Sequence, residues 1–288
     1  MNIDVTGKRV IVTGASRGIG NAIATAYAKD GAKVAICART ETTINEAGKK
    51  LTEDGAQDVI ALPVDVSNTE QVREFVKLVG ENWGGIDVLV NNAGQGRIGN
   101  LETLEPEDIL DHANNLQVAH FRFVQACAPY MRKQHWGRII NINALNGVQI
   151  PGAGFTTVSN RAAGIALSKS LGQALAKDGI LVNTLNMGWI DTGQWERHFK
   201  EMPDTITREE FYEMVTRPVP LGRLGQPEEV ANLALFLGSE LASFVSAASI
   251  DVAGGMQGQI AYYPTLKREL VEEGKRRQAE QEKNDLHM

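Results

Sequence analysis

The sequence predicts a single-domain α/β protein whose core is a doubly wound parallel sheet. Short β-rich runs alternate with amphipathic stretches along most of the 288 residues, as a parallel sheet covered by helices on both faces requires. The runs at 9–12 and 86–90 are rich in β-branched residues and nearly continuous in apolar side chains, as strands buried on both faces should be. A hydrophobic content of 43% in a chain of this length is enough to bury a full core.

The expected elements follow one another without an internal repeat. The expected strands span 8–13, 32–37, 58–64, 86–90, 137–142, 180–186 and 247–251, and the expected helices span 18–30, 42–53, 68–80, 105–133 and 157–177. Open parallel sheets bind ligands outside the carboxyl ends of their strands. The residues that follow each strand are therefore the first candidates for a site.

A glycine-rich turn joins the first expected strand to the first expected helix. It reads Thr-Gly-Ala-Ser-Arg-Gly-Ile-Gly over residues 13–20. Glycines at this place allow a tight turn and let backbone N–H groups approach a pyrophosphate at a helix N-terminus. Such turns also arise for steric reasons alone, but the position between strand and helix favours a dinucleotide site and a Rossmann-type fold.

The end of the second expected strand bears on the choice between NADP and NAD. Ala38 stands where a carboxylate would bind the adenosine ribose of NAD, whereas Arg39 follows it and Arg17 lies in the glycine-rich turn. Planar guanidinium groups match the oxygens of a ribose 2′-phosphate. We therefore expect NADP, with NAD as the alternative if both arginines are only solvated surface residues.

The third and fourth expected strands end in residues suited to adenosine. Asp65 can accept a hydrogen bond from the adenine amino group or can serve as a turn or capping aspartate, and the sequence favours neither role. Residues 91–94 read Asn-Asn-Ala-Gly, in which small side chains admit a flat adenosine and amides tie neighbouring strand ends together. Both segments fit the dinucleotide site.

Composition excludes several other classes of function. The net charge of −6, from 29 basic and 35 acidic residues, is spread along the chain without a basic block, so nucleic acid is not an expected partner. Cys37 and Cys127 lie in apolar segments without metal-ligand spacing, so we expect buried reduced thiols, no metal and a cytoplasmic location. Because the first strand begins at once and no apolar run reaches the ~18 residues of a spanning helix, neither secretion nor membrane insertion is expected.

Two segments interrupt the regular alternation. Residues 189–220 follow a strand end and are rich in aromatic and charged side chains, a composition typical of a substrate lid. Residues 258–288 end in a mixed-charge run with good helical propensity and a thin apolar face, which predicts a frayed helix or a subunit-contacting arm. We therefore expect a dinucleotide-binding domain over 1–257, with its lid at about 189–220, and a charged tail over 258–288.

Taken in order, these motifs resemble the short-chain dehydrogenase/reductase family over residues 5–256. The resemblance also covers Asn115-Leu116, 137–142, Val182-Asn183, 221–230 and 251–255. It implies a homodimer or homotetramer that transfers hydride between NADP(H) and a small carbonyl or alcohol substrate. The cofactor-binding residues that we expect are Gly14, Ser16, Arg17, Gly18, Ile19, Gly20, Arg39, Asp65, Val66, Asn92, Ala93, Gly94, Arg161, Gly188, Ile190 and Thr192.

Members of this family usually act through an Asn, a Ser, a Tyr and a Lys, and only the first of these is found at its position here. The resemblance implies Asn115 as the asparagine that helps to hold a water near the lysine. The serine position falls on Ala144, the tyrosine position on Thr157 and the lysine position on Arg161, and the flanking residues support this register. A further departure is Met187, where the family has proline.

These replacements remove the usual route for a proton. A tyrosine phenol with a pKa near 10 is made more acidic by a neighbouring ammonium, whereas a threonine hydroxyl does not ionise usefully and its side chain is shorter. Arg161 lies one helical turn beyond Thr157 on the same face, but a guanidinium that stays charged cannot relay a proton. Asn143 follows the fifth strand as a polar candidate, and His198 in the lid is the best proton donor because histidine titrates near neutrality unaided.

Three functions fit this pattern. The first is an NADP(H)-dependent oxidoreductase without the usual Tyr/Lys pair, since positioning a hydride donor contributes more to the rate than acid–base help worth ~10²–10⁴. The second is a non-redox lyase, dehydratase or retro-aldol enzyme in which Arg161, Asn143 and Arg97 polarise an oxyanion. The third is a catalytically silent NADP(H)-binding protein. The preserved dinucleotide site favours the first.

Overall fold

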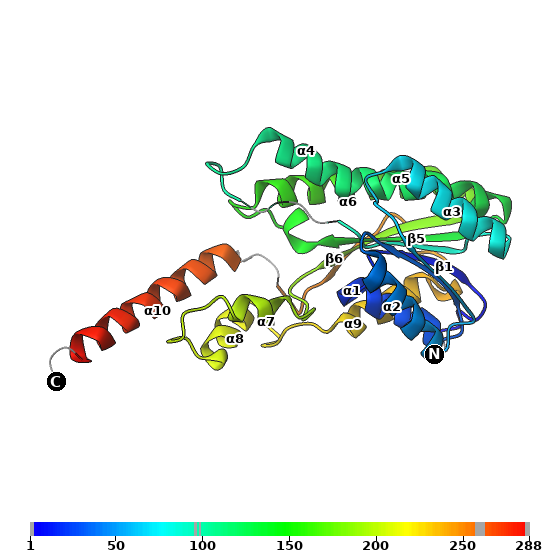
Figure 1. Ribbon diagram of the computed structural model, residues 1–288. Helices are drawn as coiled ribbons and strands as arrows, with labels where there is room; N and C mark the ends of the chain where they lie inside the picture. Colours follow the sequence, from blue (N-terminus) through cyan, green and yellow to red (C-terminus); the bar gives the residue numbers. More distant parts are fainter. Residues whose placement is uncertain (1–2, 95–96, 98, 257–262, 286–288) are drawn as a thin grey trace.

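Seven parallel strands form a single sheet in a computed structural model, which describes residues 3–94, 97, 99–256 and 263–285 (Figure 1). The strands are β1 (Arg9–Thr13), β2 (Lys33–Ala38), β3 (Asp58–Pro63), β4 (Val88–Asn91), β5 (Gly137–Ala144), β6 (Ile180–Met187) and β7 (Ser249–Val252). Their order, β3-β2-β1-β4-β5-β6-β7, confirms the predicted doubly wound sheet. The order reverses between β1 and β4, so the carboxyl ends of these two strands form the switch point where such sheets bind ligands.

Helices cover both faces of the sheet (Figure 1). One face carries α1 (Gly18–Lys29), α2 (Glu41–Glu53) and α9 (Pro227–Leu237), and the other carries α3 (Thr69–Trp83), α5 (Gln117–Lys133) and α6 (Phe155–Leu175). Because side chains alternate along a strand, Val10 and Val12 enter the first core while Ile11 enters the second. Three short 3₁₀ turns complete this part of the fold: η1 (Leu145–Gly147), η2 (Ala176–Asp178) and η3 (Glu240–Ala242).

The single helix expected over 105–133 is divided in two, so that prediction is wrong at one point. Leu116, with φ −117° and ψ −89°, separates α4 (Pro106–Asn115) from α5. A Cβ on Gly94 would lie 2.5 Å from Leu116 Cδ1 and 3.3 Å from the Asn115 carbonyl oxygen. The break therefore brings this backbone tightly against the carboxyl end of β4, a tertiary contact that helical periodicity cannot reveal.

The segment after β6, which the sequence predicts as a lid, is helical and packs against the C-terminal helix. The lid contains α7 (Gln194–Phe199) and α8 (Arg208–Thr216), and α10 (Tyr263–Asp285) extends away from the sheet beside them (Figure 1). Leu266 of α10 is 5% exposed and packs in the apolar cluster of the lid, and Arg277 pairs with Glu210 at 2.6 Å. The predicted tail is thus a helix that shares the core of the lid, while its predicted start at 258 lies outside the described residues.

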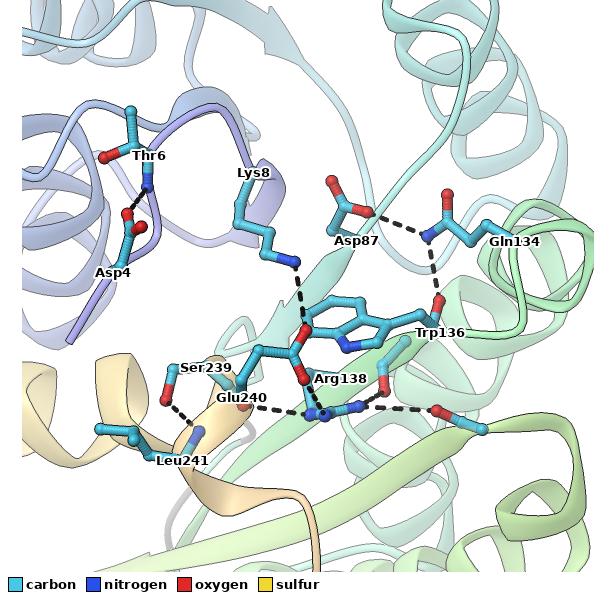
Figure 2. Close-up of polar contacts among 12 residues, drawn as sticks. Asp4, Thr6, Lys8, Asp87, Gln134, Trp136, Arg138, Ser239, Glu240 and Leu241 are labelled. Atoms are coloured by element: carbon cyan, nitrogen blue, oxygen red, sulfur yellow. Dashed lines mark hydrogen bonds and ion pairs between the residues drawn. The ribbon is translucent and has the colours of Figure 1, made fainter.

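The amino edge of the central strands is closed by a polar network (Figure 2). Lys8 Nζ lies 3.7 Å from the centroid of the Trp136 ring, and the Arg138 guanidinium carbon lies 4.2 Å from it. Glu240 lies 3.7 Å from both cations. Because each charge in this network has a partner, we assign a structural role to this edge.

Candidate functional site

The glycine-rich turn has the backbone geometry that its sequence predicts. Gly14 and Gly18 adopt φ angles of +64° and +61°, which favour glycine. A Cβ on Gly20 would lie 2.4 Å from Asn92 Nδ2 and 2.6 Å from the Gly14 carbonyl oxygen, so a larger residue does not fit without a shift. The Asn92 amide in turn donates to the carbonyl oxygens of Thr13 and Gly14, both at 3.0 Å. The end of β4 therefore holds the turn in place.

Helix α1 begins directly after this turn and presents N–H groups that no side chain caps. Its N-cap residue, Arg17, has an extended backbone and makes no side-chain cap hydrogen bond. Free N–H groups at a helix N-terminus, together with the helix dipole, favour an anion such as a pyrophosphate. Ser16 and Ile19 belong to the same partly exposed turn.

The second predicted cofactor segment, residues 188–192, reaches the same turn. A Cβ on Gly18 would lie 3.4 Å from the Thr192 side chain. A Cβ on Gly188 would lie 2.8 Å from Ala253 Cα, and Ile190 forms an isolated bridge with Gly225. The ends of β1, β4 and β6 are thus brought to one edge, as a dinucleotide site requires.

Two cations lie exposed at this edge. Arg17 and Arg39 are solvent-accessible, and neither forms an ion pair or hydrogen bond through its side chain within the described ranges of the chain. Hydrogen bonds from Ser67, and then the charges of Arg39 and Arg122, hold the pKa of Asp65 below its ordinary value. Arg39 is therefore close to the predicted adenosine position, and both arginines are available to an anion.

Asp65 makes the hydrogen bonds of a turn residue, and its contact with adenine stays a prediction. Its Oδ1 accepts from the Ser67 N–H at 2.9 Å and from the Ser67 hydroxyl at 2.7 Å. The carbonyl of the neighbouring Val66 accepts from Arg122 at 3.3 Å, and Arg122 also donates to Asn114 Oδ1 at 2.6 Å. Sequence reasoning missed Arg122, because its contacts join the turn after β3 to the end of α4 and leave no local pattern.

The positions of the expected Ser, Tyr and Lys come together around the end of β5. Ala144 ends β5, Thr157 and Arg161 lie one turn apart on α6, and all three residues are partly exposed. A Cβ on Gly147 would lie 2.8 Å from the Arg161 backbone, so η1 rests directly on α6. The residues at these three positions carry no phenol and no amine.

Asn143 lies within β5 rather than in the loop beyond it, which corrects the sequence prediction. The β5 strand pairs with β6 as far as Ala144, and Asn143 is 4% exposed. Its Nδ2 donates to the Arg161 carbonyl oxygen at 2.8 Å, and its Oδ1 accepts from the Ala144 N–H at 2.9 Å. Asn143 therefore fixes α6 against β5 and is a positioning residue for Arg161.

The two remaining catalytic candidates lie in different surroundings. The Asn115 side chain donates to the Asp111 carbonyl oxygen of its own helix at 2.8 Å. His198 lies on α7, where its ring stands 6.1 Å from that of Trp195 and its Nδ1 lies 3.7 Å from a Glu201 oxygen. Burial lowers the pKa of His198, although the charge of Glu201 opposes this. The catalytic roles of Asn115 and His198 stay predictions.

Two buried histidines that sequence reasoning missed lie within electrostatic range of Arg161. His112 on α4 is 2% exposed and His120 on α5 is 5% exposed. Burial, and then the charge of Arg161, lower the pKa of His112 to about 4 and that of His120 to about 3, so both are neutral at pH 7. Burial also lowers the pKa of Arg161 to about 10, which leaves it charged. The sequence showed only two histidines on a helix that was expected to be amphipathic.

Across the parts of the chain that the structure describes, no cluster of three or more His, Cys, Asp or Glu residues has the geometry of a metal site. In the same ranges, the helices are too short or too polar to cross a membrane.

The sheet order, the glycine-rich turn and the uncapped start of α1 define a dinucleotide-binding protein of the Rossmann type. A family model described as enoyl-(acyl carrier protein) reductase matches residues 14–257. The chain belongs to the short-chain dehydrogenase/reductase family of oxidoreductases.

Similar proteins include several reductases. The 3-oxoacyl-[acyl-carrier-protein] reductase of Vibrio cholerae is 33% identical over 89% of this chain and 99% of its own length. The structure of L-sorbose reductase from Gluconobacter frateurii, complexed with NADPH and L-sorbose, is 32% identical with a TM-score of 0.86, over 90% of this chain and 100% of that one. A short-chain oxidoreductase from Pseudomonas aeruginosa PAO1 with an atypical catalytic centre is 30% identical with a TM-score of 0.83, over 89% of this chain and 100% of that one.

Proposed function

We propose that the protein transfers hydride between NADP(H) and a small carbonyl or alcohol substrate without the family's Tyr/Lys pair. One observation carries the proposal: the complete dinucleotide turn lies at the same sheet edge as Ala144, Thr157 and Arg161. In carbonyl reduction, a hydride adds to the carbonyl carbon and a proton to its oxygen. Only the proton route differs from the usual arrangement, because hydride transfer depends mainly on positioning.

NADP(H) is the cofactor that fits this edge of the sheet, and when bound it supplies or accepts the hydride. The uncapped N–H groups of α1 would hold its pyrophosphate. The unpaired Arg17 and Arg39 would hold the 2′-phosphate, which NAD lacks. Asn92, Ala93 and Gly94 at the end of β4 would accommodate the adenosine side, and residues 188–192 the nicotinamide side. The NADPH complex of the similar L-sorbose reductase supports this assignment.

We propose that Arg161 holds the substrate beside the nicotinamide side of the site, and that water or His198 supplies the proton. A guanidinium donates hydrogen bonds at any physiological pH but does not give up its own proton. Asn143 fixes the backbone of Arg161 through its 2.8 Å hydrogen bond. The atypical catalytic centre of the similar Pseudomonas aeruginosa oxidoreductase supports a site of this kind.

The first experiment measures binding and turnover separately. We expect the purified protein to change the fluorescence of NADPH and to oxidise it with members of a panel of small aldehydes and ketones. Binding without turnover would favour a lyase, a dehydratase or a silent binding protein. Failure to bind NADPH and NADP⁺ would overturn the proposal.

A triple variant tests whether the acid–base groups are the missing part. We expect Ala144→Ser, Thr157→Tyr and Arg161→Lys together to increase carbonyl reduction by ~10²-fold, the lower part of the range for general acid–base catalysis. The matched control carries Ala144→Ser and Arg161→Lys with Thr157 unchanged. If the triple variant is no faster than this control, the proton route does not limit the rate.

We also propose that the protein is a cytoplasmic homodimer or homotetramer. Leu110 on α4 and Phe121 on α5 are 65% and 42% exposed, which favours burial against another subunit. Cys37 and Cys127 are both free and buried, which supports a reducing compartment.

A further inference from the structure

Four buried side-chain nitrogens on α4, α5 and α6 have no hydrogen-bond partner among the described residues. They are Arg161 Nε, His112 Nδ1, His112 Nε2 and His120 Nε2. Nearly all buried polar groups in proteins have a partner, so the unpartnered Nε of Arg161 indicates an unfilled polar position. The charge of Arg161 lowers the pKa of both histidines, so the three side chains lie within electrostatic range of one another.

The positive charge of Arg161 has no counterion in the described part of the chain. Its Nη1 donates to the Ile142 carbonyl oxygen at 3.4 Å and to Asn143 Oδ1 at 3.5 Å, both long for hydrogen bonds. Neither acceptor is ionised, and the described residues place no carboxylate in an ion pair with this guanidinium. A guanidinium with a buried Nε and no counterion is unfavourable unless a bound anion compensates it.

Arg138 shows what a satisfied buried arginine looks like in the same chain. It is 3% exposed, donates to the carbonyl oxygens of Gly137 at 2.9 Å and Ser239 at 3.3 Å, and lies 3.7 Å from Glu240. Figure 2 shows Arg138 beside Ser239 and Glu240. The difference indicates that the partner of Arg161 comes from outside the chain.

Two small side chains occupy the family's tyrosine and serine positions near Arg161. Thr157 one turn earlier and Ala144 at the end of β5 are partly exposed, and both are shorter than the tyrosine and serine that the family usually has there. A planar carboxylate matches a guanidinium in two parallel hydrogen bonds, which the ribose hydroxyls of a cofactor do not provide.

We propose that Arg161 binds the carboxylate of the substrate, so that the substrate is an oxo acid or a hydroxy acid. This inference rests on the proposed oxidoreductase function, of which it names the substrate class. Asn143 holds the backbone that carries Arg161.

The stability of the ligand-free protein gives the first test. We expect Arg161→Met to leave the melting temperature unchanged or to raise it, because the variant removes a positive charge that has no counterion. The matched control, Arg138→Met, should lower it, because that change breaks a satisfied network. If Arg161→Met lowers the melting temperature by as much as Arg138→Met, Arg161 is a structural residue and the proposal is wrong.

Ligand binding gives the second test and does not depend on turnover. Calorimetry with 2-oxopentanoate, 4-oxopentanoate and 5-oxohexanoate, each beside its neutral methyl ester, should show that at least one acid binds more than tenfold tighter than its ester. Arg161→Met should abolish that preference. Arg161→Lys should retain part of it, because lysine keeps the positive charge but lacks the two parallel N–H donors of a guanidinium. Equal affinity for acids and esters, or an equal preference in Arg161→Met, would overturn the proposal.

Two further binding experiments distinguish a substrate carboxylate site from a general anion site and from a cofactor site. Inorganic phosphate should bind more weakly than the best acid, and equal binding would mean a general anion site rather than a substrate site. Saturating NADPH should leave acid binding intact or strengthen it, whereas competition would mean that the cofactor occupies Arg161. Arg161-dependent acid binding without any NADPH oxidation would contradict the proposed function but not the carboxylate site.

Discussion

His112 and His120 are buried in their neutral form, and this has a consequence for stability at acidic pH. Their pKa values in the fold are about 4 and about 3, against 6.5 for an unperturbed histidine. The unfolded chain therefore binds more protons than the folded chain between pH 6.5 and these values, so stability is fully present above pH 6.5 and is lost as the pH falls.

We expect the free energy of unfolding to fall by about 1.4 kcal/mol per pH unit for each histidine below pH 6. Urea denaturation between pH 7 and pH 5 measures this slope. The variant His112→Leu should have a shallower slope, since one of the two groups is removed. A slope that is the same in wild type and variant would show that His112 does not carry the effect.

Arg39 is a second single residue that can be tested, in this case for its part in the choice between NADPH and NADH. Replacing Arg39 with Ala should weaken NADPH binding by about tenfold, the loss expected for one charge-assisted hydrogen bond, and leave NADH binding nearly unchanged. Fluorescence titration with the two reduced nucleotides measures the ratio. Equal weakening of both would mean that Arg39 does not contact the 2′-phosphate.

In the glycine-rich turn, a single added methyl group is expected to disturb both folding and cofactor binding. Gly20→Ala should lower both the melting temperature and the affinity for NADPH, because the added methyl group meets the Asn92 amide and the Gly14 carbonyl. Gly152→Ala is the matched control, since an added Cβ there meets no atom within 4 Å and its φ is not positive. If the two variants behave alike in thermal melts and NADPH titration, the glycine-rich turn has room for a side chain at position 20. The close contacts of Gly20 would then not limit NADPH binding.

The lid and α10 share one apolar cluster, which makes the tail part of the fold. Leu266→Ala removes a side chain that is 5% exposed and should destabilise the lid by about 2–4 kcal/mol. Limited proteolysis and the fluorescence of Trp195 should report this opening. Leu241→Ala, at a position 44% exposed on η3, should have little effect. If proteolysis of the lid is unchanged in Leu266→Ala, α10 does not stabilise the lid.

The sequence predicts an element well when its signal is local, and poorly when the element depends on contacts between distant segments. The strands and the glycine-rich turn have local signals, β-branched runs and glycine spacing, and their predicted bounds agree with the structure within a few residues. The break at Leu116, the strand position of Asn143 and the burial of His112 all arise from contacts between distant segments. Periodicity within one helix or strand contains no information about such contacts.

For the whole molecule, the exposed apolar side chains of α4 and α5 lead to a prediction about assembly. Phe121→Arg places a charge at a position 42% exposed and should shift the protein toward monomers, because burying an unpaired charge in an interface is unfavourable. Sedimentation velocity measures the change. Leu241→Arg, on η3, is the control. A wild-type protein that is already monomeric would contradict the proposed oligomer.

In the candidate site, the sequence predicts how the dinucleotide segments are arranged but does not predict the surroundings of Arg161. The turn at 13–20 and the segment at 91–94 come together as expected, because strand order alone brings their ends to one edge. The surroundings of Arg161 required the structure, since α4, α5, α6 and β5 each contribute to them.

The length of α10 makes it a mechanical lever for the lid. A helix of 23 residues is about 35 Å long, so a rotation of the lid by about 10° would sweep the far end of α10 through about 6 Å if the helix turned with it. A pair of spin labels, one near the end of α10 and one on the sheet, would therefore amplify small lid motions into a measurable change of distance.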